Sequence, residues 1–76
     1  MKDFLEFVVK QLVEHPDAIS IETIENGRHV LLQLKVATED TGKIIGKKGN
    51  NVAALRVLLR AIAARHDKRV ELKILS

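Results

Sequence analysis

The sequence predicts a single α+β domain in which three helices cover one face of a three-stranded sheet. Two long segments carry apolar residues at helical spacing, and three shorter segments alternate apolar and polar residues as half-buried strands do. The predicted order of elements is therefore α-β-β-α-α-β. The helices are expected at 3–14, 41–45 and 51–65, and the strands at 18–25, 28–37 and 70–75. A chain of 76 residues has the length of one domain, residues 1–76.

The first helix has sequence signals at both of its ends. Asp3 is a favourable N-cap residue, and Glu6, three positions later, completes a capping-box pattern. Pro16 is expected to stop the helix, because the residue before a proline is pushed out of the α region.

A β-hairpin follows this helix. Ile19, Ile21 and Thr23 alternate with polar residues, and Asn26-Gly27 is the strongest short hairpin signal. We expect a type I′ turn, which needs positive φ at both of these turn residues. A second alternating run after the turn supplies the other strand of the hairpin.

The long helix at 51–65 is preceded by capping residues and carries an apolar face. Asn50 or Asn51 is expected to cap it, and Glu39 and Asp40 are expected to cap the short helix before it. At about 100° per residue, five apolar side chains share the face that should enter the core. They are Val52, Leu55, Leu58, Leu59 and Ile62.

Composition argues against several classes of function. The chain has no cysteine, so it has neither a disulfide framework nor a thiolate metal site, and this fits a reducing compartment such as the cytoplasm. No apolar run approaches the length of a membrane span, and the N-terminus does not resemble a signal peptide. The three histidines are isolated in sequence, so no metal site is expected. No spacing points to an enzyme or to a cofactor.

The positive charge is concentrated in the second half of the chain. Residues 1–40 contain four basic and eight acidic residues, whereas residues 41–76 contain nine basic and two acidic ones. A basic half on a small domain suggests an anionic partner, with nucleic acid first. A solvated surface explains the same asymmetry equally well.

The segment Gly46-Lys47-Lys48-Gly49 carries the clearest chemical signal, because it lies between two predicted helices. Glycine allows a tight turn and a close approach of a ligand. The start of the following helix attracts anions through its free N–H groups and its dipole. The two lysines add charges that the turn projects into solvent. These features suit a phosphate-binding turn, and a plain helix–turn–helix connection with solubilising lysines is the alternative.

The residues around this turn extend the pattern. The stretch reads Ile44-Ile45-Gly46-x-x-Gly49-x-x-Val52, and the lead-in reads Asp40-x-Gly42-Lys43. The stretch resembles the signature of a KH domain, and the predicted order of elements resembles the bacterial type II arrangement. The whole chain is similar to the KhpA family of small KH-domain proteins. The resemblance implies a mixed sheet, with the last strand parallel to its neighbour, and binding of single-stranded RNA.

The resemblance also implies which residues form the site. In this family the turn contacts the nucleic-acid backbone, and a shallow apolar groove beside it takes about four nucleotides. The positions carried over are Gly46, Lys47, Lys48 and Gly49 in the turn and Ile45 and Val52 on the groove floor, with Lys43, Asn50 and Arg56 added by proximity. The family further implies a larger KH-domain partner (KhpB), an RNA-chaperone-like or post-transcriptional role, and a link to cell elongation and cell-wall homeostasis.

One arc of the long helix keeps a second class of function open, that of a protein-interaction adaptor. The arc is neither charged nor on the predicted core face, and it consists of Ala53, Ala54, Val57, Ala61 and Ala64. A helix that is apolar nearly all round usually has partners on both sides, so we expect a homodimer or a heterodimer through this arc. The high helix propensity of alanine explains the same residues without a partner.

Two arginines lie on a flank of the same helix. Arg56 and Arg60 are four positions apart, and like charges at this spacing mildly destabilise a helix. The pair either serves an anionic ligand or is simply solvated, and the sequence leaves both readings open.

Overall fold

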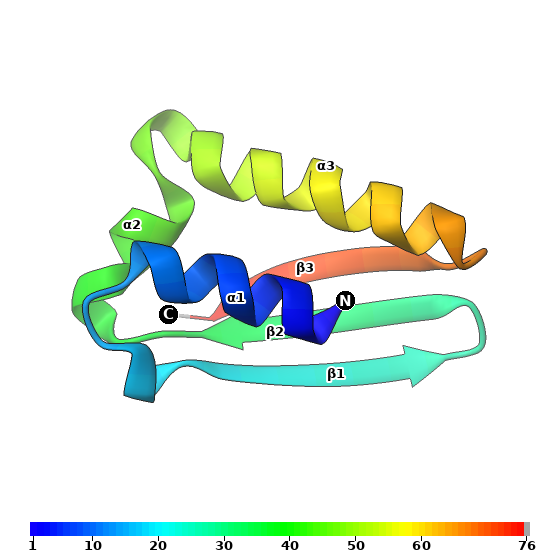
Figure 1. Ribbon diagram of the computed structural model, residues 1–76, viewed down its shortest axis with the longest axis horizontal. Coiled ribbons are helices and arrows are strands. Elements are labelled where there is room, and N and C mark those ends of the chain that lie inside the picture. The colour runs from blue at the N-terminus through cyan, green and yellow to red at the C-terminus, as the bar shows by residue number, and fades with distance from the viewer. Residues whose placement is uncertain (76) are drawn as a thin grey trace.

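The computed structural model describes residues 1–75, and its helices and strands follow the predicted order (Figure 1). The elements are α1 (Lys2–Leu12), β1 (Ser20–Asn26), β2 (His29–Lys35), α2 (Thr41–Ile45), α3 (Asn50–Arg65) and β3 (Arg69–Leu75). Short 3₁₀ turns connect them at Pro16–Ala18, Thr38–Asp40 and Lys47–Gly49. The α+β class and the α-β-β-α-α-β order are therefore confirmed.

The described residues form one three-stranded sheet in the order β1-β2-β3. β1 pairs with β2 in antiparallel fashion, and Asn26 faces His29 across the hairpin. β3 runs parallel to β2, with His29 facing Arg69, so the expected mixed sheet is confirmed. β1 and β3 are the two edge strands, and of the seven residues of β1 only Ile21 is not exposed. Helices α1 and α3 cover the same face of the sheet, with α3 along β3 (Figure 1).

The core lies between the helices and the sheet. The largest fully buried apolar side chains come from α1, β2, α2 and α3, and they are Leu5, Val9, Leu32, Leu34, Ile44 and Leu59. β2 is the central strand, and its alternate residues point into this core, as the sequence alternation predicts. Burying a side chain of this size stabilises the fold by about 1.5–3 kcal/mol.

The core-facing stripe of α3 differs from the prediction at three residues, because Ile62, also expected in the core, is only half-buried. Leu58, expected in the core, is 48% exposed, whereas Ala63 is buried with 1% exposure. The buried stripe is Val52, Leu55, Leu59 and Ala63. The last turn of α3 lies close to the chain that returns into β3, because Lys68 N–H donates to the Ala63 carbonyl at 2.8 Å. A small side chain fits this close approach, and Leu58 is left on the side of the helix that faces α1 and solvent.

The ends of α1 also differ from the prediction. Met1 rather than Asp3 occupies the N-cap position, and no side-chain capping bond forms, so the capping box is wrong. The Leu5 N–H donates to the Met1 carbonyl at 3.0 Å, which starts the helix before Asp3. The helix ends at Leu12, and Pro16 begins a separate 3₁₀ turn.

The hairpin turn uses Gly27 and Arg28 rather than Asn26 and Gly27, because Asn26 still pairs with His29. Gly27 has φ of 62°, and neither Asn26 nor Arg28 has positive φ. The expected type I′ turn is therefore wrong, and a single positive φ at the first loop residue is the pattern of a type II′ turn.

Within residues 1–75, no helix is long and apolar enough to span a bilayer.

Candidate nucleic-acid interface

The turn between α2 and α3 has an unusual backbone. Three of its four residues have positive φ: 75° at Gly46, 57° at Lys48 and 76° at Gly49. A Cβ added to Gly46 would lie 2.6 Å from Asn51 Cγ and 2.9 Å from Asn51 N, whereas one added to Gly49 would meet no atom within 4 Å. Gly46 is therefore required both by its backbone angle and by the close approach of Asn51, and Gly49 by its angle alone.

Three backbone hydrogen bonds hold the turn together. Gly46 N–H donates to the Gly42 carbonyl at 2.8 Å, and Gly49 N–H donates to the Gly46 carbonyl at 3.1 Å. Asn50 N–H donates to the Lys47 carbonyl, which joins the turn to α3. Neither lysine belongs to an ion pair of the described chain, and both are exposed. Two free ammonium groups beside the start of α3 form a site for an anion.

Asn51 fixes the geometry of this turn. Its Nδ2 donates to the Lys43 carbonyl at 2.8 Å, which ties the last turn of α2 to the first turn of α3. The predicted capping role of Asn50 or Asn51 is wrong, because Gly49 occupies the N-cap position and makes no side-chain bond. Asn50 is the first residue of α3 and its side chain is exposed. Sequence spacing gave no signal for the Asn51 contact, since it reaches eight residues back along the chain.

A groove opens beside the turn, between α2, α3 and the edge of β3. Its volume is about 640 Å³, and it is lined by Leu31, Ile45, Val52, Arg56, Glu71, Leu72, Lys73 and Ile74. The structure thus brings together Ile45, Val52 and Arg56 as the prediction has them. Most of the remaining lining comes from β3, and sequence reasoning did not assign these residues to the site. Alternation in β3 alone could not reveal that this strand faces α3.

Arg56 stands at the border of this groove. Its Nη2 donates to the Leu72 carbonyl at 3.2 Å, and the residue is half-buried. A guanidinium group has five N–H donors, so this bond leaves others free for a ligand.

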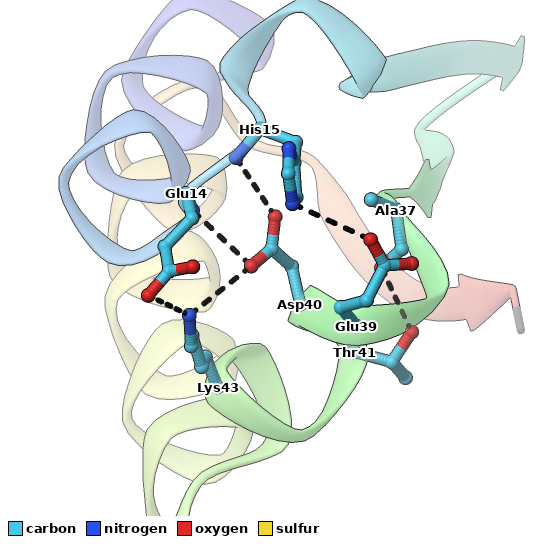
Figure 2. Close-up of polar contacts among 7 residues, drawn as sticks. All are labelled: Glu14, His15, Ala37, Glu39, Asp40, Thr41 and Lys43. Atoms are coloured by element: carbon cyan, nitrogen blue, oxygen red, sulfur yellow. Dashed lines mark hydrogen bonds and ion pairs between the residues drawn. The ribbon is translucent and has the colours of Figure 1, made fainter.

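Lys43 takes part in an ion-pair cluster at the other end of α2 (Figure 2). Its Nζ lies 2.9 Å from Glu14 Oε1 and 3.4 Å from Asp40 Oδ1. Asp40 is fully buried, and its carboxylate accepts the backbone N–H groups of Glu14 and His15 at 3.1 and 3.0 Å. A nucleic-acid contact by Lys43 stays a prediction, and a phosphate would compete there with two carboxylates.

The prediction that Glu39 and Asp40 cap the helix at 41–45 is wrong. Asp40 occupies the N-cap position of α2 but makes no side-chain bond to that helix. Its carboxylate instead accepts the free N–H groups that follow α1, which a single-sequence pattern cannot show because they lie 25 and 26 residues away. Glu39 points to His15, with 3.4 Å between Oε2 and Nε2 (Figure 2).

The pKa values of this cluster follow from its contacts. Burial raises the pKa of Asp40, but the hydrogen bonds from Glu14 N–H, His15 N–H and the Lys43 ammonium outweigh it, so the net shift is downward. The hydrogen bond from Lys43 lowers the pKa of Glu14, and the same bond raises the pKa of Lys43. All three groups are therefore charged at neutral pH, which keeps α1 and α2 joined.

The apolar arc of α3 is left uncovered. Its five residues, Ala53, Ala54, Val57, Ala61 and Ala64, are all exposed. Val57 is 62% exposed, and Phe7 on α1 is 65% exposed. A shallow apolar hollow of about 180 Å³ lies between α1 and α3 and is lined in part by Val8, Leu12 and Leu58. A role of this surface in binding a protein stays a prediction.

Comparisons with known proteins give a consistent result. The family described as "KhpA/KhpB, KH domain" matches residues 2–74. "RNA-binding protein KhpA" of Chlamydia caviae is 40% identical over 75 residues, which cover 99% of this chain and 96% of that protein. The protein of the same name from Clostridium acetobutylicum is 40% identical and covered in full, and that from Borreliella burgdorferi is 42% identical over 73 residues, with 96% of this chain and 89% of that protein covered.

No solved structure matches the chain at a significant level. Among residues 1–75, no three His, Asp or Glu side chains lie together as metal ligands would. The expectation that the chain is not an enzyme agrees with the family that matches it. With the match spanning almost every residue, the chain belongs to the KhpA/KhpB family of KH domains.

Proposed function

We propose that the chain binds single-stranded RNA, with the turn at 46–49 holding the backbone and the adjacent groove holding bases. The observation that carries this proposal is the geometry of the turn: two exposed, unpaired lysines lie between Ile45 and Val52, which both line the adjacent groove. The shared name of the relatives, "RNA-binding protein KhpA", supports the same ligand.

In this mechanism the turn binds the sugar-phosphate backbone of the RNA and the groove binds its bases. A phosphate accepts hydrogen bonds from the ammonium groups of Lys47 and Lys48, which also neutralise its charge. Gly46 and Gly49 carry no Cβ, so the sugar-phosphate chain can lie directly against the turn. The exposed first residue of α3, Asn50, offers a further polar contact.

Bases enter the groove beside the turn. Ile45 and Val52 provide apolar contact from the helices, and Arg56 provides free N–H donors at the border. Only single strands present unstacked bases in this way. The chain has two aromatic residues, Phe4 and Phe7, and both lie on α1, away from the groove. Without aromatic stacking we expect weak binding with modest base preference from one domain.

The test is fluorescence anisotropy of a labelled single-stranded RNA pool with the native chain and the Lys47→Asp/Lys48→Asp variant. Circular dichroism first confirms that both are folded. We expect the variant to lose binding, and the native affinity to fall with salt. Loss of two phosphate contacts should reduce the slope of log K against log salt by about 1.4, at about 0.7 per phosphate. A single-stranded DNA pool in parallel measures the contribution of the 2′-hydroxyl.

A matched control separates the turn from overall charge. Lys2→Asp/Lys10→Asp makes the same charge change on α1, away from the groove. We expect it to keep most of the native affinity. Equal losses in both variants would mean that net charge alone drives binding, and equal binding by all three proteins would remove the mechanism.

A second candidate function is that of a protein-interaction module, favoured by the exposed apolar surface of α3 and α1. We propose that the arc at 53–64, together with the exposed Phe7 of α1, pairs with a second copy of the chain or with a larger KH-domain protein of the KhpB type. The family that matches includes both KhpA and KhpB. An exposed patch of this kind on a small domain is typical of an interaction site.

Sedimentation velocity at two concentrations tests this proposal. Val57→Glu places a charge in the arc, and Ile24→Glu places one at an exposed apolar residue of β1, 45% exposed, as the matched control. We expect Val57→Glu to abolish association and Ile24→Glu to leave it unchanged. A native chain that is monomeric at both concentrations and does not bind purified KhpB would contradict the proposal.

The cellular role that we propose comes from family resemblance. It comprises action in the cytoplasm as an RNA chaperone or post-transcriptional regulator, and a part in cell elongation and cell-wall homeostasis. Complementation of a deletion strain separates the two functions. We expect Lys47→Asp/Lys48→Asp to fail if RNA binding underlies the phenotype, and Val57→Glu to fail if partner binding does.

A further inference from the structure

The groove beside the turn continues along α3. Three hollows follow one another, and each shares lining residues with the next. The groove of about 640 Å³ shares Arg56 and Glu71 with a hollow of about 230 Å³, and this one shares Arg60 and Glu71 with a third of about 380 Å³. Arg69 lines the third hollow at the far end. The third hollow reaches past β3 onto the sheet, because residues of β1 and β2 also line it: Ile24, Asn26, His29, Val30 and Leu31. We call the path from Ile45 along α3 and the edge of β3 to Arg69 the furrow.

The furrow carries unpaired positive charge beyond the groove. Arg60 on α3 and Arg69 at the start of β3 are both exposed, and neither belongs to an ion pair within residues 1–75. Nearby, Arg28 and Lys68 are already paired with Asp67 and Glu25 and are therefore not counted. Glu71 is the acidic residue that lines the furrow, and it lines all three hollows.

The position of Arg60 separates it from the turn. It lies eleven residues after Gly49, which is about 17 Å along a helix axis. Arg60 is therefore placed to reach a part of a bound strand other than the part held at the turn. Arg69, at the opposite end of β3 from Leu75, extends the path in the same direction.

The open edge of β3 gives the furrow a polar wall. β3 pairs only with β2, and the Leu72 carbonyl faces the other way, where it accepts Arg56. Peptide groups on a strand alternate in direction, so Val70, two residues earlier, presents its N–H and carbonyl to the furrow as well. Such groups can pair with base edges, while the arginines hold phosphates.

We infer that a bound single strand longer than the groove continues along the furrow, with its phosphates held by Arg60 and Arg69. This inference rests on the proposed RNA-binding function and extends the footprint past the about four nucleotides of a KH groove. The occupant is the same nucleic-acid strand, because the furrow is continuous with the turn and its free charge is positive.

Labelled random-sequence RNA pools of increasing length, from tetramer to decamer, test this inference by anisotropy. We compare the native chain with Arg60→Gln/Arg69→Gln, which removes two charges but keeps long side chains. The matched control is Lys10→Gln/Arg65→Gln, because both residues lie outside the furrow. Circular dichroism checks the fold of each variant.

We expect the affinity of the native chain and of the control to rise about tenfold with RNA length, which corresponds to about 1.4 kcal/mol. This rise is counted beyond the gain that a longer RNA has from offering more binding registers. The Arg60→Gln/Arg69→Gln variant should bind the tetramer as the native chain does and lack this extra gain. Its salt slope on the decamer should be lower by about 1.4. Glu71→Gln should strengthen binding of the decamer, because it removes a negative charge from the path.

The outcomes distinguish this inference from the proposed function. If Lys47→Asp/Lys48→Asp loses tetramer binding while Arg60→Gln/Arg69→Gln keeps the full gain with length, the turn binds RNA and the furrow inference is wrong. The furrow inference is also wrong if the affinity of the native chain rises with RNA length no more than the additional binding registers explain. If the native chain binds no pool, or if the turn variant binds as well as the native chain, the proposed function fails and the inference fails with it.

Discussion

The glycines of the second half of the chain should respond to alanine in a fixed order, because each has a different environment. Gly42 lies in α2 with ordinary φ, and an added Cβ would meet no atom within 4 Å. Gly49 has φ of 76° with open space around it, and Gly46 combines φ of 75° with contacts of 2.6 to 2.9 Å to Asn51. The series therefore separates backbone angle from steric contact.

The expected magnitudes follow from these environments. Gly42→Ala should stabilise the fold by about 0.4–1 kcal/mol, because alanine is the better helix residue and restricts the unfolded chain. Gly49→Ala should cost about 1–2 kcal/mol, the penalty of the left-handed conformation. Gly46→Ala should cost about 2–5 kcal/mol, since overpacking against Asn51 adds about 1–3 kcal/mol to that penalty.

Urea denaturation followed by circular dichroism measures the three free energies of unfolding. Equal costs for Gly46→Ala and Gly49→Ala would refute the close contact with Asn51. An Asn51→Gly background gives a second check, because it removes the atoms at 2.6 and 2.8 Å and leaves only the backbone nitrogen at 2.9 Å. In that background the extra cost of Gly46→Ala should shrink, and an unchanged cost would contradict the steric argument.

Three further predictions concern acid stability, the strained lysine and the core. The pKa of Asp40 is lowered in the folded state, so its contribution to the free energy of unfolding should be fully present above the ordinary pKa of 3.8 and should be lost as pH falls through the folded pKa. Asp40→Asn should reduce this loss of stability in acid, as measured by denaturation at several pH values. An unchanged pH dependence would count against the cluster. Lys48→Gly should stabilise the fold by about 0.5–1 kcal/mol, because it relieves the φ of 57°, although the RNA affinity should fall. Lys47→Gly should destabilise the fold, because Lys47 has ordinary φ. A change in the free energy of unfolding of the same sign in both variants would argue against strain at Lys48. Leu59→Ala should cost about 2–5 kcal/mol in urea and Leu58→Ala less than about 1, and similar costs would disprove the burial difference.

The order of elements could be predicted because local patterns determine it. Alternation in β2 and helical spacing in α1 and α3 each reflect one buried face, which a single segment reveals by itself. The orientation of α3 needed more than this. Leu58 and Ala63 are both within reach of the core face on a helical projection, and only the positions of α1 and the returning chain decide which one is buried.

Part of the candidate site could likewise be predicted from local sequence, and part of it could not. The turn and the groove floor at Ile45 and Val52 are local in sequence, so motif and resemblance could place them. The roles of Asp40 and Asn51 could not be predicted, because each side chain bonds to backbone that is distant in sequence. Arg69 joins the furrow only through the parallel pairing of β3 with β2, which periodicity does not specify.

The parallel pairing of β3 has a consequence for how the chain acquires its structure. The β1–β2 hairpin closes through a two-residue loop, whereas β2 meets β3 only after α2 and α3 have intervened, as in the pairing of His29 with Arg69. Contacts between distant segments form late, because the entropy of closing the intervening loop must be overcome first. We therefore expect the hairpin to be a fast, local event and the docking of β3 to limit the folding rate. A nascent chain still lacking β3 on the ribosome has one wall of its groove missing, so the ability to recognise a ligand should arrive only with the last strand.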